Sequence, residues 1–251
     1  MNPGNAAIAI DGLTKVYKGN SKPALNNISL TIDRGHIFGL LGPNGAGKTT
    51  MIRILCGLLS ATSGEVFING LPVKEKLREI RRIIGVVPQE IALYPSLTAY
   101  ENLSVYGGIC GLKGKNFKLR LEELLPVFGL EKSLHSRVDR FSGGMKRRLN
   151  LMVGMLPNPL ILFLDEPTVG VDVQSKKVIL ENLVSTNQSG TTIIYTSHYL
   201  EEAENLCTDI AILDEGQIIS RGSPEHIRNS GDSPASLEEI FLALTGKQVR
   251  D

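Results

Sequence analysis

A glycine-rich stretch at residues 42–50 constrains this chain more strongly than any other feature of its sequence. It fits the pattern G-x-x-x-x-G-K-[ST], in which glycines let successive backbone N–H groups turn toward a bound phosphate. The apolar run at residues 37–41 predicts a buried parallel strand before it, and residues 51–55 continue it as a helix. Because strand, glycine loop and helix follow in the order that the motif requires, we favour a phosphate-binding loop over a glycine-rich turn that binds nothing.

Two side chains of this stretch have separate roles in the expected site. Lys48 carries a mobile positive charge for the β- and γ-phosphates of a nucleotide. The hydroxyl of Thr49 is an oxygen ligand of the kind that Mg²⁺ prefers. The residues that we expect to bind the nucleotide are Gly42, Pro43, Asn44, Gly45, Ala46, Gly47, Lys48, Thr49 and Thr50.

A pair of carboxylates marks the end of a second apolar strand, at residues 160–164. Ligands of open α/β sheets bind at the carboxyl ends of the strands. We therefore expect Asp165 to hold Mg²⁺ through water and Glu166 to accept a proton from the water that attacks the γ-phosphate. The alternative is a solvated strand end before the turn at Pro167.

Two more polar side chains follow predicted strands. Gln89 comes just after the strand at residues 83–87, where its amide could reach the metal or the attacking water. His198 follows the strand at residues 191–196, where its imidazole could hydrogen-bond the γ-phosphate. A surface glutamine and an ordinary histidine are the plain alternatives.

A second candidate anion site begins another helix, at residues 143–156. Ser142, Gly143 and Gly144 would place N–H groups at its positive end. A single chain has no evident use for a second phosphate site, whereas in a two-fold dimer this site could face the nucleotide of the partner. The alternative is a plain N-cap, because serine is favoured there. We expect residues 146–148, Lys-Arg-Arg, to form a solvated helix face.

The composition narrows the classes of function. The chain has 251 residues and a net charge of +1, which gives no field that marks a nucleic-acid binder. Its 3 cysteines lie far apart, which argues against disulfides or a zinc site. No apolar run approaches the ~18 residues needed to span a bilayer. We therefore expect another chain to carry any membrane-spanning part.

The order of the predicted elements suggests one large domain with an insertion. Alternating patterns within residues 8–32 and 65–70 predict antiparallel strands around the first parallel strand. Residues 88–158 have a helical texture and include a capping box of Thr98 and Glu101. A second capping box, Ser236 and Glu239, opens a short helix at about residues 236–245.

Taken together, these motifs resemble those of the ATP-binding subunits of ABC transporters, in the order that the family has them. The resemblance implies an α/β fold, namely a P-loop NTPase (RecA-like) core with an antiparallel β subdomain and an inserted α-helical subdomain. One nucleotide-binding domain would span residues 1–251, with its core at about 1–87 and 159–228 and its helical subdomain at about 88–158.

The same resemblance implies roles for individual residues. Tyr17 would stack on adenine, and base–aromatic stacking is worth ~1–3 kcal/mol. Asp172 closes the D-loop at residues 169–172. Met145 stands where the usual Leu-Ser-Gly-Gly-Gln signature ends in glutamine, and it cannot offer the hydrogen bonds of an amide. The residues expected to contact the partner's ATP are Ser142, Gly143, Gly144 and Met145, and those expected to hold Mg²⁺ are Thr49, Gln89 and Asp165.

The signature sequence at residues 142–149 and the closing residues 236–246 resemble one branch of the family, the ABC-2 type exporters of drugs, sodium, lipids or polysaccharides. This resemblance implies an ATPase at the cytoplasmic face of a membrane, with ATP and Mg²⁺ as cofactors. Its partners would be membrane-spanning permease subunits and a second copy of itself or of a homologous ATPase.

The alternative function is a soluble ABC ATPase that acts as a clamp on ribosomes or DNA. It is disfavoured because the chain has one cassette, no heptad insertion and a nearly neutral charge. A non-hydrolysing binder is disfavoured because Lys48, Asp165, Glu166 and His198 are all present.

Overall fold

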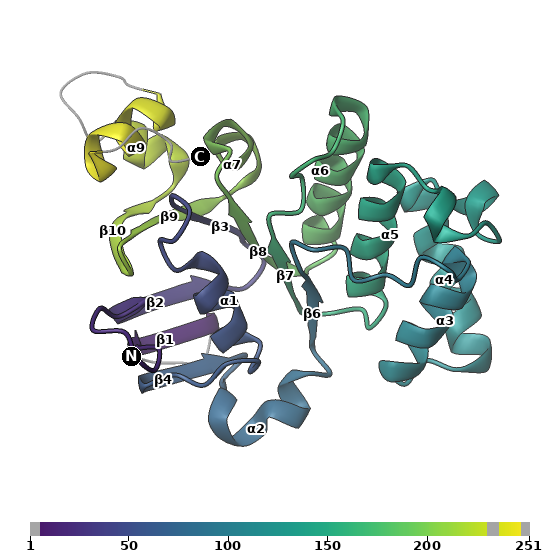
Figure 1. Cartoon of the computed structure of the whole chain (residues 1–251), viewed down its shortest axis with the longest axis horizontal. Helices are drawn as coiled ribbons and strands as arrows, with labels where there is room; N and C mark the ends of the chain where they lie inside the picture. The colour runs from purple at the N-terminus through teal and green to yellow at the C-terminus, as the bar shows by residue number, and fades with distance from the viewer. Residues whose placement is uncertain (1–5, 230–235, 247–251) are drawn as a thin grey trace. The chain divides into compact units, whose positions relative to one another are not determined.

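A computed structural model describes residues 6–229 and 236–246. The chain divides into two compact units, one made of Met1–Arg81 with Thr192–Asp251 and the other of Arg82–Thr191. Figure 1 shows the elements of each unit. Each unit has strands whose ends carry the motifs found in the sequence.

The first unit contains an antiparallel sheet of order β2-β1-β4-β5. Its strands are β1 (Ala6–Lys15), β2 (Leu25–Asp33), β4 (Ser63–Ile68) and β5 (Leu71–Pro72). The inward positions of β2 alternate with exposed ones, as a strand with one buried face requires. This confirms the predicted antiparallel strands.

The first unit also contains the parallel strands that lead to the phosphate loop. Strand β3 (Ile37–Leu41) pairs in parallel with β8 (Thr192–Ser197) and with β9 (Asp209–Asp214). Strand β10 (Gln217–Gly222) runs antiparallel to β9. All residues of β3 are buried, which explains its continuous apolar sequence. The helices of this unit are α1 (Lys48–Leu55), α2 (Val73–Ile80), α7 (Leu200–Leu206), α8 (Pro224–Arg228) and α9 (Leu237–Thr245).

The second unit combines two parallel strands, β6 (Ile84–Val87) and β7 (Ile161–Asp165), with a set of helices. Helix α5 (Gly143–Met155) packs against α3 (Ala99–Ile109), α4 (Gly114–Phe128) and α6 (Val173–Gln188). Two short 3₁₀ turns, Glu131–Ser133 and Val138–Arg140, lead into α5. The chain between β6 and β7 is thus mainly helical, although the exact limits that we assign to the core and helical subdomains stay predictions.

Both predicted capping boxes are present. The Thr98 side chain accepts a hydrogen bond from the Glu101 N–H, and the Glu101 carboxylate accepts one from the Thr98 N–H. The backbone hydrogen bond from Thr98 lowers the pKa of Glu101. Ser236 and Glu239 form the same arrangement at the start of α9. Each box satisfies N–H groups that a helix otherwise leaves without partners.

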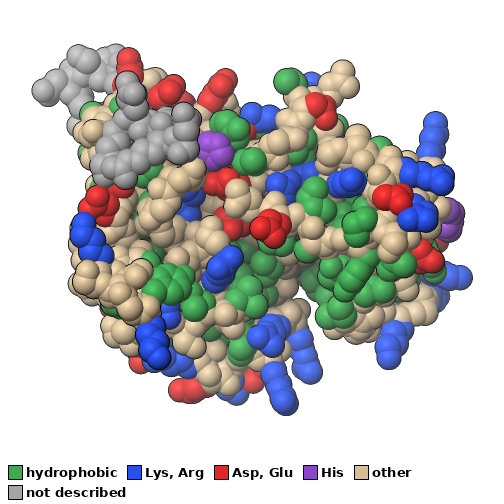
Figure 2. Space-filling view, in the orientation of Figure 1, with side chains coloured by type: hydrophobic (Ala, Val, Ile, Leu, Met, Phe, Trp, Pro, Cys, Tyr) green, Lys and Arg blue, Asp and Glu red, His purple; other side chains and the backbone are tan. Residues whose placement is uncertain are grey.

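The surface carries charges of both signs. Figure 2 shows Lys and Arg side chains interspersed with Asp and Glu on the visible face, in keeping with the net charge of +1. Within residues 6–229 and 236–246, none of the helices has the length and apolar character that crossing a membrane requires.

A buried amide fixes the loop that precedes α3. The Asn102 side chain is fully buried, and its Oδ1 accepts a hydrogen bond from the Tyr94 N–H at 2.8 Å. Its Nδ2 donates to the carbonyls of Tyr94 and Thr98, at 3.0 and 2.9 Å. One side chain therefore satisfies three backbone groups of residues 94–98.

Replacing Asn102 by alanine should lower the free energy of unfolding by about 2–3 kcal/mol, because buried backbone groups lose their partners. Denaturant unfolding followed by circular dichroism measures this loss. Ser104→Ala, at an exposed position of the same helix, is the control and should change stability by less than about 0.5 kcal/mol. Equal stabilities of the two variants would show that the amide network contributes nothing.

Candidate functional site

The phosphate loop connects β3 to α1 and holds Lys48 across its own backbone. Gly47 has a φ of 112°, and a Cβ there would lie 2.6 Å from the carbonyl oxygen of Ala24, so only glycine fits. The Lys48 side chain is 5% exposed. Its Nζ donates to the carbonyls of Gly42 and Pro43 at 2.8 and 3.2 Å. The ammonium group is therefore fixed above the loop whose N–H groups we expect to bind phosphate.

Tyr17 lies at the start of the helix that follows the phosphate loop. Its hydroxyl is hydrogen-bonded to the Thr50 Oγ1 at 3.1 Å. The ammonium of Lys15 lies 5.3 Å from the centre of the Tyr17 ring, at cation–π distance. The family resemblance gives Tyr17 the role of stacking on adenine, and that role stays a prediction.

His198 reaches the same edge of the sheet through strand register. Strands β3 and β8 are parallel, with Leu41 opposite Ser197. Gly42 and His198, the next residues of each strand, therefore leave the sheet side by side. The rings of His198 and Tyr199 are 4.1 Å apart between centroids. His198 is thus close to the start of the phosphate loop, as its expected contact with the γ-phosphate requires.

The second unit brings Gln89 and Glu166 together. Strands β6 and β7 are parallel with Val87 opposite Leu164, so the residues that follow emerge from neighbouring strand ends. Nε2 of Gln89 donates to Oε2 of Glu166 at 3.0 Å. Glu166 has a left-handed backbone with a φ of 48°, which is uncommon for glutamate and often marks functional sites. Its side chain and that of Asp165 are both buried.

The signature residues form the start of α5. Ser142 caps the helix by accepting a hydrogen bond from the Met145 N–H at 3.2 Å. A Cβ on Gly144 would lie 2.2 Å from Oγ of Ser175, so the starts of α5 and α6 are in close contact. Asp172 caps α6 through the Ser175 N–H, and this hydrogen bond lowers the pKa of Asp172. Signature and D-loop therefore share one packed corner.

Our expectation of a solvated face at residues 146–148 is wrong for Arg147. Its side chain is 4% exposed and donates to the carbonyls of Pro88, Gln89 and Glu166. Asn150, one turn later, accepts a hydrogen bond from the Ala92 N–H at 3.2 Å. The sequence does not reveal either role: a run of basic residues looks the same whether its helix face meets water or backbone carbonyls, and Asn150 belongs to no recognised motif.

The expected metal ligands are all oxygen donors. Thr49 supplies a hydroxyl, Gln89 an amide oxygen and Asp165 a carboxylate, which suits a hard cation such as Mg²⁺ that keeps several waters and binds substrate phosphates. In the described part of the chain, no cluster of three or more His, Cys, Asp or Glu side chains could hold a metal by itself. The three oxygen donors suit a magnesium that binds together with the phosphates of a nucleotide.

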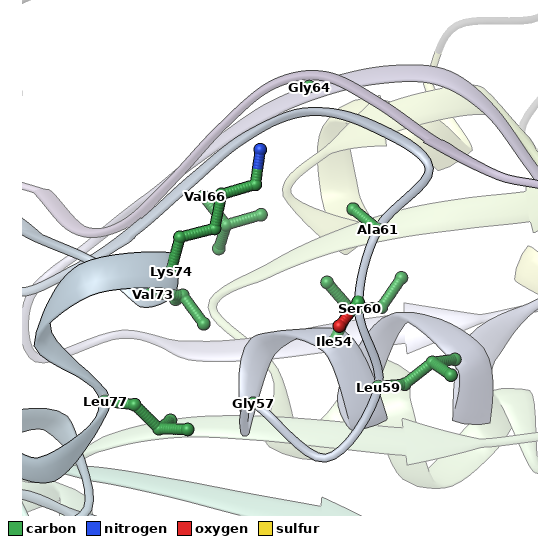
Figure 3. A pocket seen from close by; sticks show the side chains of 10 residues that line it. All are labelled: Ile54, Gly57, Leu59, Ser60, Ala61, Gly64, Val66, Val73, Lys74 and Leu77. Carbon is green, nitrogen blue, oxygen red and sulfur yellow. The ribbon is translucent and has the colours of Figure 1, made fainter.

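A mainly apolar pocket of about 230 Å³ lies at the far end of α1 from the phosphate loop. Figure 3 shows Val73 and Leu77 of α2 and Val66 of β4 beside the last turn of α1. A second cavity, of about 410 Å³, includes Gly45 of the phosphate loop in its lining. The sequence motifs point to the loop and not to the apolar pocket.

Comparisons with known proteins agree with this site. A family model described as ABC transporter matches residues 25–169. The linearmycin resistance ATP-binding protein LnrL of Bacillus subtilis is 43% identical, over 92% of this chain and 76% of the relative. A Nod factor export ATP-binding protein I of Cupriavidus pinatubonensis is 40% identical, over 99% of this chain and 94% of the relative. A daunorubicin resistance ATP-binding protein of Streptomyces coeruleorubidus is 39% identical, over 89% and 69%.

Solved structures of ABC cassettes are also similar to this chain in fold. The ATP-binding subunit of an ABC transporter superposes with a TM-score of 0.86 at 31% identity, covering 95% of this chain and 99% of its own. A dimeric ATP-binding cassette in a post-hydrolysis state with ADP and phosphate superposes with a TM-score of 0.78 at 29% identity, covering 86% and 98%. The fold is that of an ABC ATPase cassette, as the sequence predicted.

The chain therefore belongs to the ABC transporter family. It is an ATP-binding subunit and an ATPase, and its relatives include proteins named for export and for drug resistance.

Lys48→Ala should weaken ATP binding about 10- to 100-fold, because a charge-assisted hydrogen bond is worth about 1.5–3 kcal/mol. Titration with a fluorescent ATP analogue measures the dissociation constant. Lys76→Ala removes an exposed lysine of α2 and should leave that constant unchanged. Undiminished binding by Lys48→Ala would overturn the role given to the phosphate loop.

Proposed function

We propose that this chain is the ATP-hydrolysing motor of an ABC-2 type exporter. In this proposal, two copies hold two Mg-ATP molecules between the phosphate loop of one and the signature of the other, and their closure drives membrane-spanning permease subunits. The observation that supports it best is the Gln89–Glu166 pair, a buried carboxylate held by an amide at neighbouring strand ends.

Hydrolysis needs positioning and charge more than covalent chemistry. Glu166 would accept the proton of the attacking water, and Gln89 would orient that water or the metal. Thr49 and Asp165 would hold Mg²⁺, which neutralises phosphate charge when it is bound. Lys48 would bind the β- and γ-phosphates, and His198 would hydrogen-bond the γ-phosphate.

The signature at residues 142–145 is the feature of this chain that argues for a dimer. Ser142 and Gly143 are exposed, while Gly144 is buried against α6. An exposed helix N-terminus with a serine cap can bind an anion. In the dimer, that anion would be a phosphate of the partner's nucleotide. A solved dimeric ATP-binding cassette with ADP and phosphate, similar to this chain in fold, supports a dimer. Met145 lacks the side-chain amide of the usual glutamine, and its N–H donates a hydrogen bond to the Ser142 Oγ.

Export is the direction that the relatives favour, since their names describe Nod factor export and resistance to linearmycin and daunorubicin. The motor would sit at the cytoplasmic face, attached through its permease. We place the docking site in the loop between β6 and α3. Ile91 and Tyr94 are exposed there, and the Asn102 network holds the loop in shape.

Glu166→Gln should keep ATP affinity and lower kcat by about 10²–10⁴-fold, because the base is lost and the shape is kept. Steady-state phosphate release measures the rate, and light scattering with ATP measures the mass of the trapped dimer. Glu122→Gln, an exposed glutamate of α4, is the control and should behave as wild type. Normal turnover of Glu166→Gln would refute the assignment of the base.

A photo-crosslinking residue at position 94 should capture a permease subunit when the two are co-expressed in membranes. The same probe at position 119, an exposed leucine of α4, should capture none. Mass spectrometry identifies the captured chain. The preparation must be one in which the permease stimulates the ATPase. If the probe at position 94 then captures no permease subunit, the docking site is excluded.

A further inference from the structure

Arg147 connects the signature helix to two loops that we expect to act in catalysis. Its Nη1 donates to the carbonyls of Pro88 and Gln89 at 3.2 and 2.9 Å. Its Nη2 donates to the carbonyl of Glu166 at 3.2 Å. The guanidinium therefore bonds the main chain on either side of the Gln89–Glu166 side-chain contact.

The contacts of Arg147 compensate for burying a charge. A guanidinium that is 4% exposed loses most of its hydration, and burial lowers its pKa while the nearby charge of Glu166 raises it. Its planar, forked donors can bond several carbonyls at once, which the single ammonium of a lysine cannot reproduce. The arrangement is stable only while all three carbonyls keep their positions, so it fixes the backbone that carries Gln89 and Glu166.

A second residue on the same helix face strengthens this connection. Asn150 lies three residues after Arg147, so both side chains project from one face of α5. Its Oδ1 accepts from the Ala92 N–H at 3.2 Å. Helix α5 thus binds the segment 88–92 at two points, and Arg147 adds a bond to the carbonyl of Glu166.

The next residue, Arg148, provides a matched contrast. It too belongs to α5 and donates to main-chain carbonyls, those of Phe128 and Gly129, at 2.6 and 3.5 Å. Those carbonyls lie at the C-terminal end of α4, an element that carries none of the expected catalytic residues. The two arginines therefore make the same kind of bond to different parts of the second unit.

We propose that Arg147 is a positioning residue for ATP hydrolysis, holding the backbones of Gln89 and Glu166 in register with the signature helix. A shift of α5 would then be passed directly to the base and to the loop that begins at Gln89. This inference rests on the proposed function, which gives Glu166 the role of base and Ser142 a contact with ATP. The inference adds that Arg147 connects the helix that begins after Ser142 to the backbone of Glu166.

The test compares Arg147→Met, Arg147→Lys and Arg148→Met. Arg147→Met should lower kcat roughly 100-fold, the cost of misplacing a catalytic group by about 1 Å, with KM for ATP changed less than about threefold. Arg147→Lys should lie between Arg147→Met and wild type, because one ammonium replaces only part of the fork. Arg148→Met should lower the melting temperature but keep kcat within about threefold of wild type.

A double-mutant cycle separates positioning from general destabilisation. Because Arg147 acts through Gln89 and Glu166, combining Arg147→Met with Gln89→Ala should cost less than the product of the two single losses in kcat. Combining Arg148→Met with Gln89→Ala should give a simple product. Multiplicative losses in both cycles, or equal losses of kcat and melting temperature for the two arginines, would overturn the inference.

Glu166→Gln, measured in parallel, separates the role of Glu166 as base from the positioning role of Arg147. If that variant retains turnover, the proposed function fails and takes the role of Arg147 with it. If Glu166→Gln is inactive while Arg147→Met turns over like Arg148→Met, the proposed function stands and only the positioning role is wrong.

Discussion

Parallel strand register is the constraint on which the site depends. In one unit, the pairing of Leu41 with Ser197 brings the phosphate loop and His198 to one edge. In the other, the pairing of Val87 with Leu164 does the same for Gln89 and Glu166. A shift by one residue would turn each of these side chains to the opposite face of its strand. Every residue of β3 and β7 is buried, so a shift would draw the polar residues that follow each strand into the apolar core, at a cost in free energy.

The polar residues of the second unit are held mainly by bonds to main chain. Asn102 holds the loop at residues 94–98, Asn150 and Arg147 hold residues 88–92, and Asp172 caps α6. Buried polar groups need such partners, because each unsatisfied one costs about 1–3 kcal/mol. The same bonds that stabilise the loops therefore also connect the signature helix to Gln89 and Glu166.

Much of the site could be predicted because its residues belong to short sequence motifs. The phosphate loop, the carboxylate pair and both capping boxes depend on neighbours within a few residues, and the structure confirms the caps and the strand ends. Arg147 could not be predicted, because its partners lie 58, 59 and 19 residues away. The contact of Tyr17 could not be predicted from the sequence pattern either, because its partner Thr50 lies 33 residues away.

The central claim, that a complete site needs two copies, is tested most directly by mixing two inactive variants. Lys48→Ala disables the phosphate loop, and Ser142→Glu places a negative charge at the signature. A mixed dimer keeps one intact site, made from the loop of one copy and the signature of the other. An equal mixture should therefore regain roughly a quarter of wild-type ATPase activity, since half the dimers are mixed and each has one of two sites. Activity of the mixture no greater than the sum of the separate variants, with mixed dimers demonstrated to form, would contradict the account.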